Sequence, residues 1–158
     1  MMLVYLTILT KLIIFKKPLG YVKNYLLHHY HWQQVKANMH TANLVPFATI
    51  KLYWNARHQT ENVWLNLWGN VIGFIPLGMM LPLLFKRLNS FVSTAFCVFL
   101  FSLAFEIFQL LTMLGIFDVD DLLLNTLGGA IGFILFWLLV KMGIVSKKQS
   151  LGFGDLGV

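Results

Sequence analysis

Three long apolar runs dominate the chain and limit the folds that it can adopt. They extend over Val63 to Phe85, Phe91 to about Leu114 and Leu122 to about Val140. Each run is close to the roughly 17 to 25 residues that a membrane-spanning helix needs. Because a bilayer offers no water to the backbone, such a run folds as a helix that satisfies its own N–H and C=O groups. The three runs therefore predict three transmembrane helices.

The first segment, Met1 to Phe15, is also apolar but shorter than a usual spanning helix. It lacks the basic start and the small-residue cleavage site of a secretory signal. We expect an uncleaved first membrane helix here, and a helix lying at the membrane interface is the alternative. With this segment, the sequence predicts an all-α integral membrane protein with a small bundle of about four transmembrane helices.

The composition supports this class. Hydrophobic residues make up 58% of the chain and charged residues 11%, and the mean hydropathy is +0.73, far too apolar for a water-soluble domain of this length. The net charge is +6, but most bases flank apolar runs, where they meet lipid headgroups. We therefore expect membrane lipids as partners. We expect no nucleic acid, because the aromatic residues do not alternate with Lys and Arg as they do on a nucleic-acid-binding surface.

The domain is expected to cover residues 1–145, followed by a disordered Gly-rich tail over residues 146–158. In the first loop, Lys23 to Lys36 mixes aromatic and apolar residues with His and Lys, which predicts an amphipathic helix at the membrane interface. Four of the five histidines lie in the same loop: His28, His29, His31 and His40. We predict no metal there, because adjacent histidines point to different sides of a helix and no Cys, Asp or Glu lies nearby.

Four of the six carboxylates gather in one stretch: Glu106, Asp118, Asp120 and Asp121. An ionisable group at the centre of a membrane helix costs roughly 2.5 to 3.5 kcal/mol on insertion scales, so a functional role is the default hypothesis. Gln109 lies three residues after Glu106, on nearly the same face of a helix. The structural alternative is that the aspartates cap the helix that follows them, and we expect this of Asp120 rather than of Glu106.

Amide side chains extend this polar pattern into the neighbouring helices. Asn66 and Asn70 lie one turn apart, and Asn125 lies one turn after Asp121. In a bundle of alternating helices, the start of the second, the end of the third and the start of the fourth helix lie on one side of the membrane. We therefore predict an acid and amide pocket formed by Asn70, Glu106, Gln109, Asp118, Asp121 and Asn125.

Small residues mark positions where helices are expected to pack closely. Gly69 and Gly73 form one small-xxx-small pair, and Gly128 and Gly132 form a second. Prolines at 76 and 82 interrupt the hydrogen-bond ladder of the second apolar run.

Four short segments of the sequence resemble those of a known family. They are Asn43 to Phe47 (NLVPF), Gly69 to Gly78 (GNVIGFIPLG), Glu106 to Gln109 (EIFQ) and Phe117 to Gly129 (FDVDDLLLNTLGG). In this order, and over residues 43–140, they resemble the VanZ-like family of bacterial membrane proteins. Many members have an Arg shortly before the Phe-Asp pair, where this chain reads Gly115-Ile116.

The resemblance implies a multi-pass protein of the bacterial cell membrane with a role in the cell envelope. The family is named for its association with resistance to the glycopeptide antibiotic teicoplanin, and the resemblance assigns no reaction. It adds Asn43 to the ligand-binding set. It also implies structural roles for Pro46, Phe47, Pro76, Gly78, Gly128 and Gly132.

Three functions follow as alternatives. The first is binding of a polar ligand, such as a lipid headgroup, a wall precursor or a glycopeptide, with a contribution to glycopeptide resistance. The second is a membrane enzyme that acts on a lipid or wall precursor, with catalytic candidates Glu106, Asp118 and Asp121. No cofactor is expected, and a divalent cation at Asp118 and Asp121 is the alternative. The third is a small transporter, which would need a homo-oligomer because four helices are few.

Overall fold

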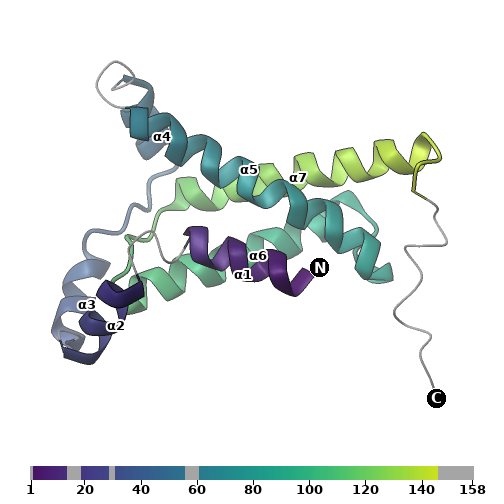
Figure 1. Ribbon diagram of the computed structural model, residues 1–158. Helices are drawn as coiled ribbons and strands as arrows, with labels where there is room; N and C mark the ends of the chain where they lie inside the picture. Colours follow the sequence, from purple (N-terminus) through teal and green to yellow (C-terminus); the bar gives the residue numbers. More distant parts are fainter. Residues whose placement is uncertain (1, 14–18, 29–30, 56–60, 146–158) are drawn as a thin grey trace. The chain divides into compact units, whose positions relative to one another are not determined.

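A computed structural model describes residues 2–13, 19–28, 31–55 and 61–145 (Figure 1). The predicted tail over residues 146–158 and His29 lie outside these residues. Every regular element of the described chain is helical: α1 Met2–Ile13, α2 Leu19–His28, α3 Trp32–Met39, α4 Ala48–Asn55, α5 Glu61–Leu84, the 3-10 helix η1 Lys86–Leu88, α6 Phe91–Thr112 and α7 Val119–Lys141.

Three of the described helices are long and apolar enough to cross a membrane. The candidate spans are Asn66–Leu84 in α5, Phe91–Thr112 in α6 and Val119–Lys141 in α7. The predicted all-α class is confirmed, and the three candidate spans agree with a membrane protein. The helix α1 has 12 residues and is not among the three, so a fourth span stays a prediction.

The loop before α5 differs from the expectation. Instead of one helix over Lys23 to Lys36, the structure has α2 and α3, and α2 ends at His28. His31 is extended, with φ −133°, and its carbonyl accepts the N–H groups of Gln34 and Val35. A new helix therefore begins at Trp32. The short helix α4 was not predicted, because its eight residues are too few to show a reliable period.

The start of α7 also differs from the expectation. The helix begins at Val119 rather than at Leu122, so Asp120 and Asp121 lie in its first turn. Negative side chains are favourable in that turn, because they complement the partial positive charge of the helix N-terminus. The helix α5 continues through Pro76 and Pro82. A break would leave more backbone groups unpaired in lipid than the two prolines do.

The chain divides into two compact units. The first contains Met1–Thr60 and Ser102–Leu122, and the second contains Glu61–Phe101 and Leu123–Val158. The helices α6 and α7 are continuous, so each contributes one part to the first unit and one part to the second.

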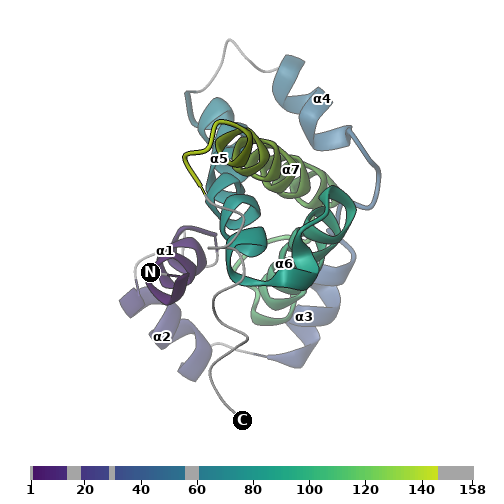
Figure 2. The same cartoon turned by 90° about the vertical axis from the view of Figure 1, so that its right-hand side faces the viewer.

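In the second unit, α5 and α7 touch backbone to backbone, and both ribbon views place them side by side (Figure 2). A Cβ atom added at Gly128 would lie 2.1 Å from the carbonyl oxygen of Val71, and one at Gly132 would lie 2.0 Å from that of Ile75. Such distances are impossible for real atoms, so only glycine fits. Gly78 is equally close to Gly129.

Gly69 behaves differently from these glycines. No described neighbour lies within 4 Å of a Cβ added at this residue, so the expected close approach of another helix is not found there. The core of the second unit instead consists of large apolar side chains from α5, α6 and α7: Val71, Phe74, Leu77, Leu81, Val98, Phe133 and Phe136.

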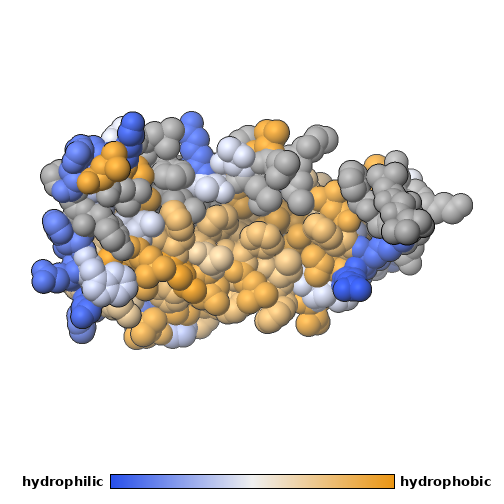
Figure 3. All heavy atoms as spheres, turned by 90° about the horizontal axis from the view of Figure 1, so that it is seen from below, coloured by the Kyte–Doolittle hydropathy of each residue, from blue (hydrophilic) through white to orange (hydrophobic). Residues whose placement is uncertain are grey.

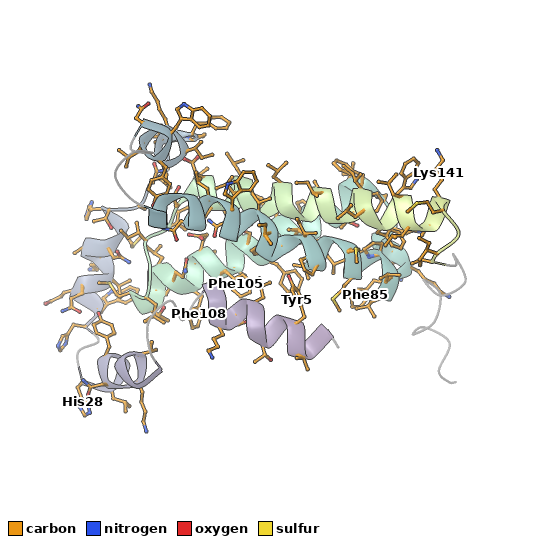
Figure 4. The ribbon with its side chains drawn as sticks, turned by 45° about the horizontal axis from the view of Figure 1, so that its top comes forward. Tyr5, His28, Phe85, Phe105, Phe108 and Lys141 are labelled. Carbon is orange, nitrogen blue, oxygen red and sulfur yellow. The ribbon has the colours of Figure 1, made fainter. Side chains whose placement is uncertain are left out.

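The outer faces of the long helices are apolar. Trp68 and Ile72 of α5, Phe96 of α6 and Leu127 of α7 are more than half exposed, and apolar side chains cover much of the face seen in Figure 3. Exposed apolar surface of this extent is typical of a membrane or protein interface, which agrees with the three candidate spans. At the end of α7, Lys141 lies with its Nζ atom 4.8 Å from the centre of the Trp137 ring (Figure 4).

Candidate functional site

A stripe of polar side chains is buried along the part of α6 that belongs to the first unit. Ser102, Glu106 and Gln109 are 0%, 1% and 5% exposed. Their spacing of four and three residues puts them on one face of the helix. Since lipid cannot pair with a carboxylate or an amide, this face must pack against protein.

Glu106 reaches across the turn between α6 and α7. Its Oε2 atom accepts the backbone N–H of Asp118 at 3.0 Å. Asp118 immediately precedes the first residue of α7, so the carboxylate of Glu106 lies at the positive end of that helix. The start of α7 therefore supplies a hydrogen-bond donor to the buried carboxyl group of Glu106.

Asp118 binds the loop around Asn43 to the start of α7. Its Oδ1 atom accepts hydrogen bonds from the side-chain amide of Asn43 at 3.0 Å and from the backbone N–H of Asp120 at 2.8 Å. Its Oδ2 atom accepts the hydroxyl of Thr49 at 2.6 Å. The bond to Asp120 is the pattern of a helix N-cap, so Asp118 caps α7.

The backbone strengthens this link. The N–H of Asn43 donates to the carbonyl of Phe117 at 2.9 Å, and the N–H of Val119 donates to the carbonyl of Asn43 at 3.0 Å. These two bonds form an isolated parallel bridge between Asn43 and Asp118. The loop is thus held by main-chain as well as side-chain bonds.

Asp120 caps a helix, as the structural alternative predicted, but the helix is α4 rather than α7. Its carboxylate is fully buried and accepts three backbone N–H groups, those of Phe47, Thr49 at 2.8 Å and Ile50 at 3.0 Å. These donors belong to the N-terminus of α4 and the residue before it. Phe47 has a left-handed backbone, with φ 65°, a conformation that costs energy for a bulky residue. Asp120 therefore stabilises an unfavourable turn.

The end of α6 is capped by Asn38, a residue that no sequence motif singles out. The side-chain amide of Asn38 donates to the carbonyls of Leu110 at 3.3 Å and Gly115 at 3.1 Å. Met113, between them, has φ 59°, which matches the left-handed residue that often ends a helix. The side chain of Gln109 packs closely against Gly115 in this turn. A Cβ atom added at Gly115 would lie 3.0 Å from the Cδ atom of Gln109.

Several of the predicted ligand-binding residues come together in the first unit. Hydrogen bonds join Asn43 and Glu106 through Asp118, and Gln109 shares the buried stripe. Asp121 is half-buried in the first turn of α7. Asn70 and Asn125 are buried at 9% and 1% exposure, but in the second unit, so their convergence with Glu106 stays a prediction.

The predicted structural residues of the loop are exposed. Pro46 and Phe47 both face outward, and Phe47 is 64% exposed. Sequence reasoning missed Asn38 and Thr49. Neither residue lies in a recognisable motif. Asn38 binds the backbone carbonyls of Leu110 and Gly115, and Thr49 binds the carboxylate of Asp118, 69 residues away.

The described residues contain no group of three or more His, Cys, Asp or Glu side chains that could hold a metal ion. His28, His31 and His40 are all exposed, and Figure 4 shows His28 at the end of α2. The first unit contains the acidic and amide side chains that can accept hydrogen bonds, those of Glu106, Gln109, Asp118 and Asp121.

Comparison with known proteins agrees with the resemblance seen in the motifs. Protein VanZ of Enterococcus faecium is 42% identical to the chain over 69 residues, which cover 44% of this chain and 42% of that protein. The aligned part is therefore less than half of either protein. No solved structure matches the chain. The family model described as VanZ/LLP1 matches residues 2–140, which is nearly the whole chain, and the protein belongs to this family.

Proposed function

We propose that the protein is a multi-pass membrane protein of the bacterial cell envelope that binds a polar ligand beside Glu106. The ligand is a lipid headgroup, a wall precursor or a glycopeptide antibiotic, and its binding contributes to glycopeptide resistance. The binding groups in the first unit are Asn43, Glu106, Gln109, Asp118 and Asp121. The helix α1 is the fourth membrane segment in this proposal.

The burial of Glu106 within an apolar span is the observation that supports the proposal. The side chain is 1% exposed and lies in the candidate span Phe91–Thr112. A neutral glutamine would also accept the N–H of Asp118, so the hydrogen bond alone does not require an acid. Because a charge at this depth is costly, a role for the charge itself, such as pairing with an ammonium group of a ligand, accounts for it better.

The family match supports a role in the envelope rather than a particular ligand. The relative is named Protein VanZ, and the alignment covers only part of each chain. We therefore extend the association with teicoplanin resistance to this protein as part of the proposal. The acceptor-rich site is compatible with the amines and amides of a glycopeptide and with the ammonium group of a lipid headgroup.

The test measures binding to the purified protein in lipid nanodiscs. Teicoplanin, a lipid-linked wall precursor and short-chain phosphatidylethanolamine are titrated against wild type and against Glu106→Gln, which removes the charge and keeps the acceptor. A lost charged hydrogen bond costs about 1.5 to 3 kcal/mol, so at least one ligand should bind roughly 10- to 100-fold more weakly.

Asp120→Asn is the matched control for this experiment. It makes the same acid-to-amide change at another buried carboxylate, whose bonds go to the backbone of the loop before α4 and of α4 itself. We expect it to lower stability while ligand affinity stays near that of wild type. Equal affinities of wild type and Glu106→Gln for every ligand would reject the site.

A membrane enzyme acting on a lipid or wall precursor is the second candidate function. The observation that favours it is the contrast between two linked carboxylates: Glu106 is almost fully buried, whereas Asp118 is half-buried and accepts three hydrogen bonds. Different surroundings of this kind separate the roles of an acid and a base. Turnover of a lipid-linked precursor that Glu106→Gln abolishes without weakening binding would establish the enzyme.

A further inference from the structure

The segment between Leu44 and Asn55 exposes an unusual amount of apolar surface. Five of its apolar side chains are between 58% and 67% exposed: Leu44, Val45, Phe47, Leu52 and Trp54. The helix α4 within it buries none of its residues. We call this segment, residues 44–55, the loop platform. In water such a surface would be unfavourable, so the platform requires an apolar surrounding.

The hydrogen bonds of the loop platform place it at the boundary of the membrane. Its first turn is bonded to Asp120, and Asn43, immediately before it, is bonded to Phe117 and Val119. Val119 is the first residue of the candidate span Val119–Lys141. A segment fixed to the first residues of a span lies at the depth where the hydrocarbon meets the headgroups.

The charge of the surrounding sequence indicates which headgroups the platform meets. Between residues 16 and 60 the chain contains no Asp or Glu and six basic residues: Lys16, Lys17, Lys23, Lys36, Lys51 and Arg57. Lys51 lies on α4 beside Leu52, and both are exposed. A lysine among apolar residues can keep its stem in the apolar layer while its ammonium reaches the phosphates. Anionic lipids attract such bases.

We propose that the loop platform is a lipid-binding element that lies in the headgroup layer of the same bilayer that α7 crosses. Leu44, Val45, Phe47, Leu52 and Trp54 contact the upper acyl chains, and Lys51 contacts the phosphates of anionic lipids. Asp120 fixes the depth of the platform by capping α4. This element goes beyond the proposed ligand site and does not depend on it.

The test places a fluorescent label that is sensitive to polarity on the full chain in nanodiscs. In a Cys97→Ser background, Phe47→Cys and Leu52→Cys report on the platform. Leu100→Cys, on the exposed side of α6, is the lipid reference, and Asn89→Cys, in the exposed loop before α6, is the aqueous reference. Iodide quenches labels from the water, and lipids brominated near the headgroup quench them from the membrane.

Both platform labels should emit at shorter wavelength than the label at residue 89. Iodide should quench them severalfold less, and the brominated lipids severalfold more. With anionic phosphatidylglycerol in place of neutral lipid, quenching by brominated lipid at residue 52 should rise, and Lys51→Gln should abolish that rise. Iodide access equal to that at residue 89 would overturn the proposal, and so would labels shielded from both quenchers, which would mean that protein or a second copy covers the platform.

A second measurement uses the wild-type chain and needs no substitution. A photoactivatable phospholipid is incorporated into the nanodiscs and the adducts are mapped by mass spectrometry. We expect adducts within residues 44–55 and on the exposed face of α6. Adducts on α6 without any in the platform would contradict the inference even if a cysteine variant failed to fold.

Discussion

The two units hold the same two helices, α6 and α7, by different forces. In the first unit, the contacts of these helices with the preceding loops are hydrogen bonds to carboxylates and amides, such as those of Asp118 and Asp120. In the second unit, α7 meets α5 through glycines whose backbones touch. Polar contacts fix a geometry that chemistry can use, whereas close packing resists any change in shape. The described contacts of α6 and α7 are therefore mainly polar in the first unit, whereas in the second unit they include close backbone packing.

The largest expected effect comes from filling the glycine contact. Gly128→Val would put a side chain where a Cβ already lies 2.1 Å from the carbonyl oxygen of Val71, so α5 and α7 must separate. We expect a loss of about 3 kcal/mol or more of unfolding free energy, measured by denaturation in a fixed detergent. Gly69→Ala is the control, since that residue has no described neighbour within 4 Å. Equal losses would show that close packing is not what holds the second unit.

The next largest effect concerns the cap of α4. Asp120→Ala removes an acceptor of three backbone N–H groups and leaves Phe47 in its left-handed conformation. We expect about 2 to 3 kcal/mol of destabilisation. Hydrogen exchange should accelerate most at the amides of Phe47, Thr49 and Ile50. Unchanged protection at these amides would mean that the carboxylate is not their partner in solution.

A smaller effect is expected from removing the Thr49 hydroxyl, which bonds to both Asn43 and Asp118. Thr49→Val keeps the shape of the side chain but removes its hydrogen bond to Asp118 at 2.6 Å and its acceptance of the Asn43 amide. The unfolding free energy should fall by about 1 kcal/mol. Thr49→Ser retains the hydroxyl and should lose less. If the two variants are equally destabilised, the methyl group rather than the hydroxyl supports the loop.

The smallest effect should come from the far end of α7, in the second unit. Lys141→Gln removes the charge that lies over Trp137, a contact expected at about 0.5 kcal/mol, the lower end for exposed sites. Lys141→Arg retains the charge and should match wild type in the same denaturation assay. A loss as large as that of Asp120→Ala would mean that polar contacts matter equally in both units.

Length and hydropathy were enough to predict α5, α6 and α7 to within a few residues, because lipid leaves a long apolar run few alternatives to a helix. The burial of Glu106 and Gln109 also followed from their spacing. The partners of Asp120 could not be predicted, because they are backbone N–H groups of a distant loop. Almost every residue type has such a group, so no residue pattern identifies the partner. The same holds for Asn38, whose amide binds two carbonyls. Local spacing also could not tell that Gly128 meets another backbone and Gly69 does not.

The bridge between Asn43 and Asp118 has a consequence for how the chain matures. The two residues are separated by 75 positions, so the ribosome must add 75 residues after Asn43 before the second partner exists. Closing so long a loop is slow relative to forming local helices. The segment around Asn43 therefore stays without this bridge until the first turn of α7 has been synthesised. A stop codon placed before that turn would yield a chain that degradation removes.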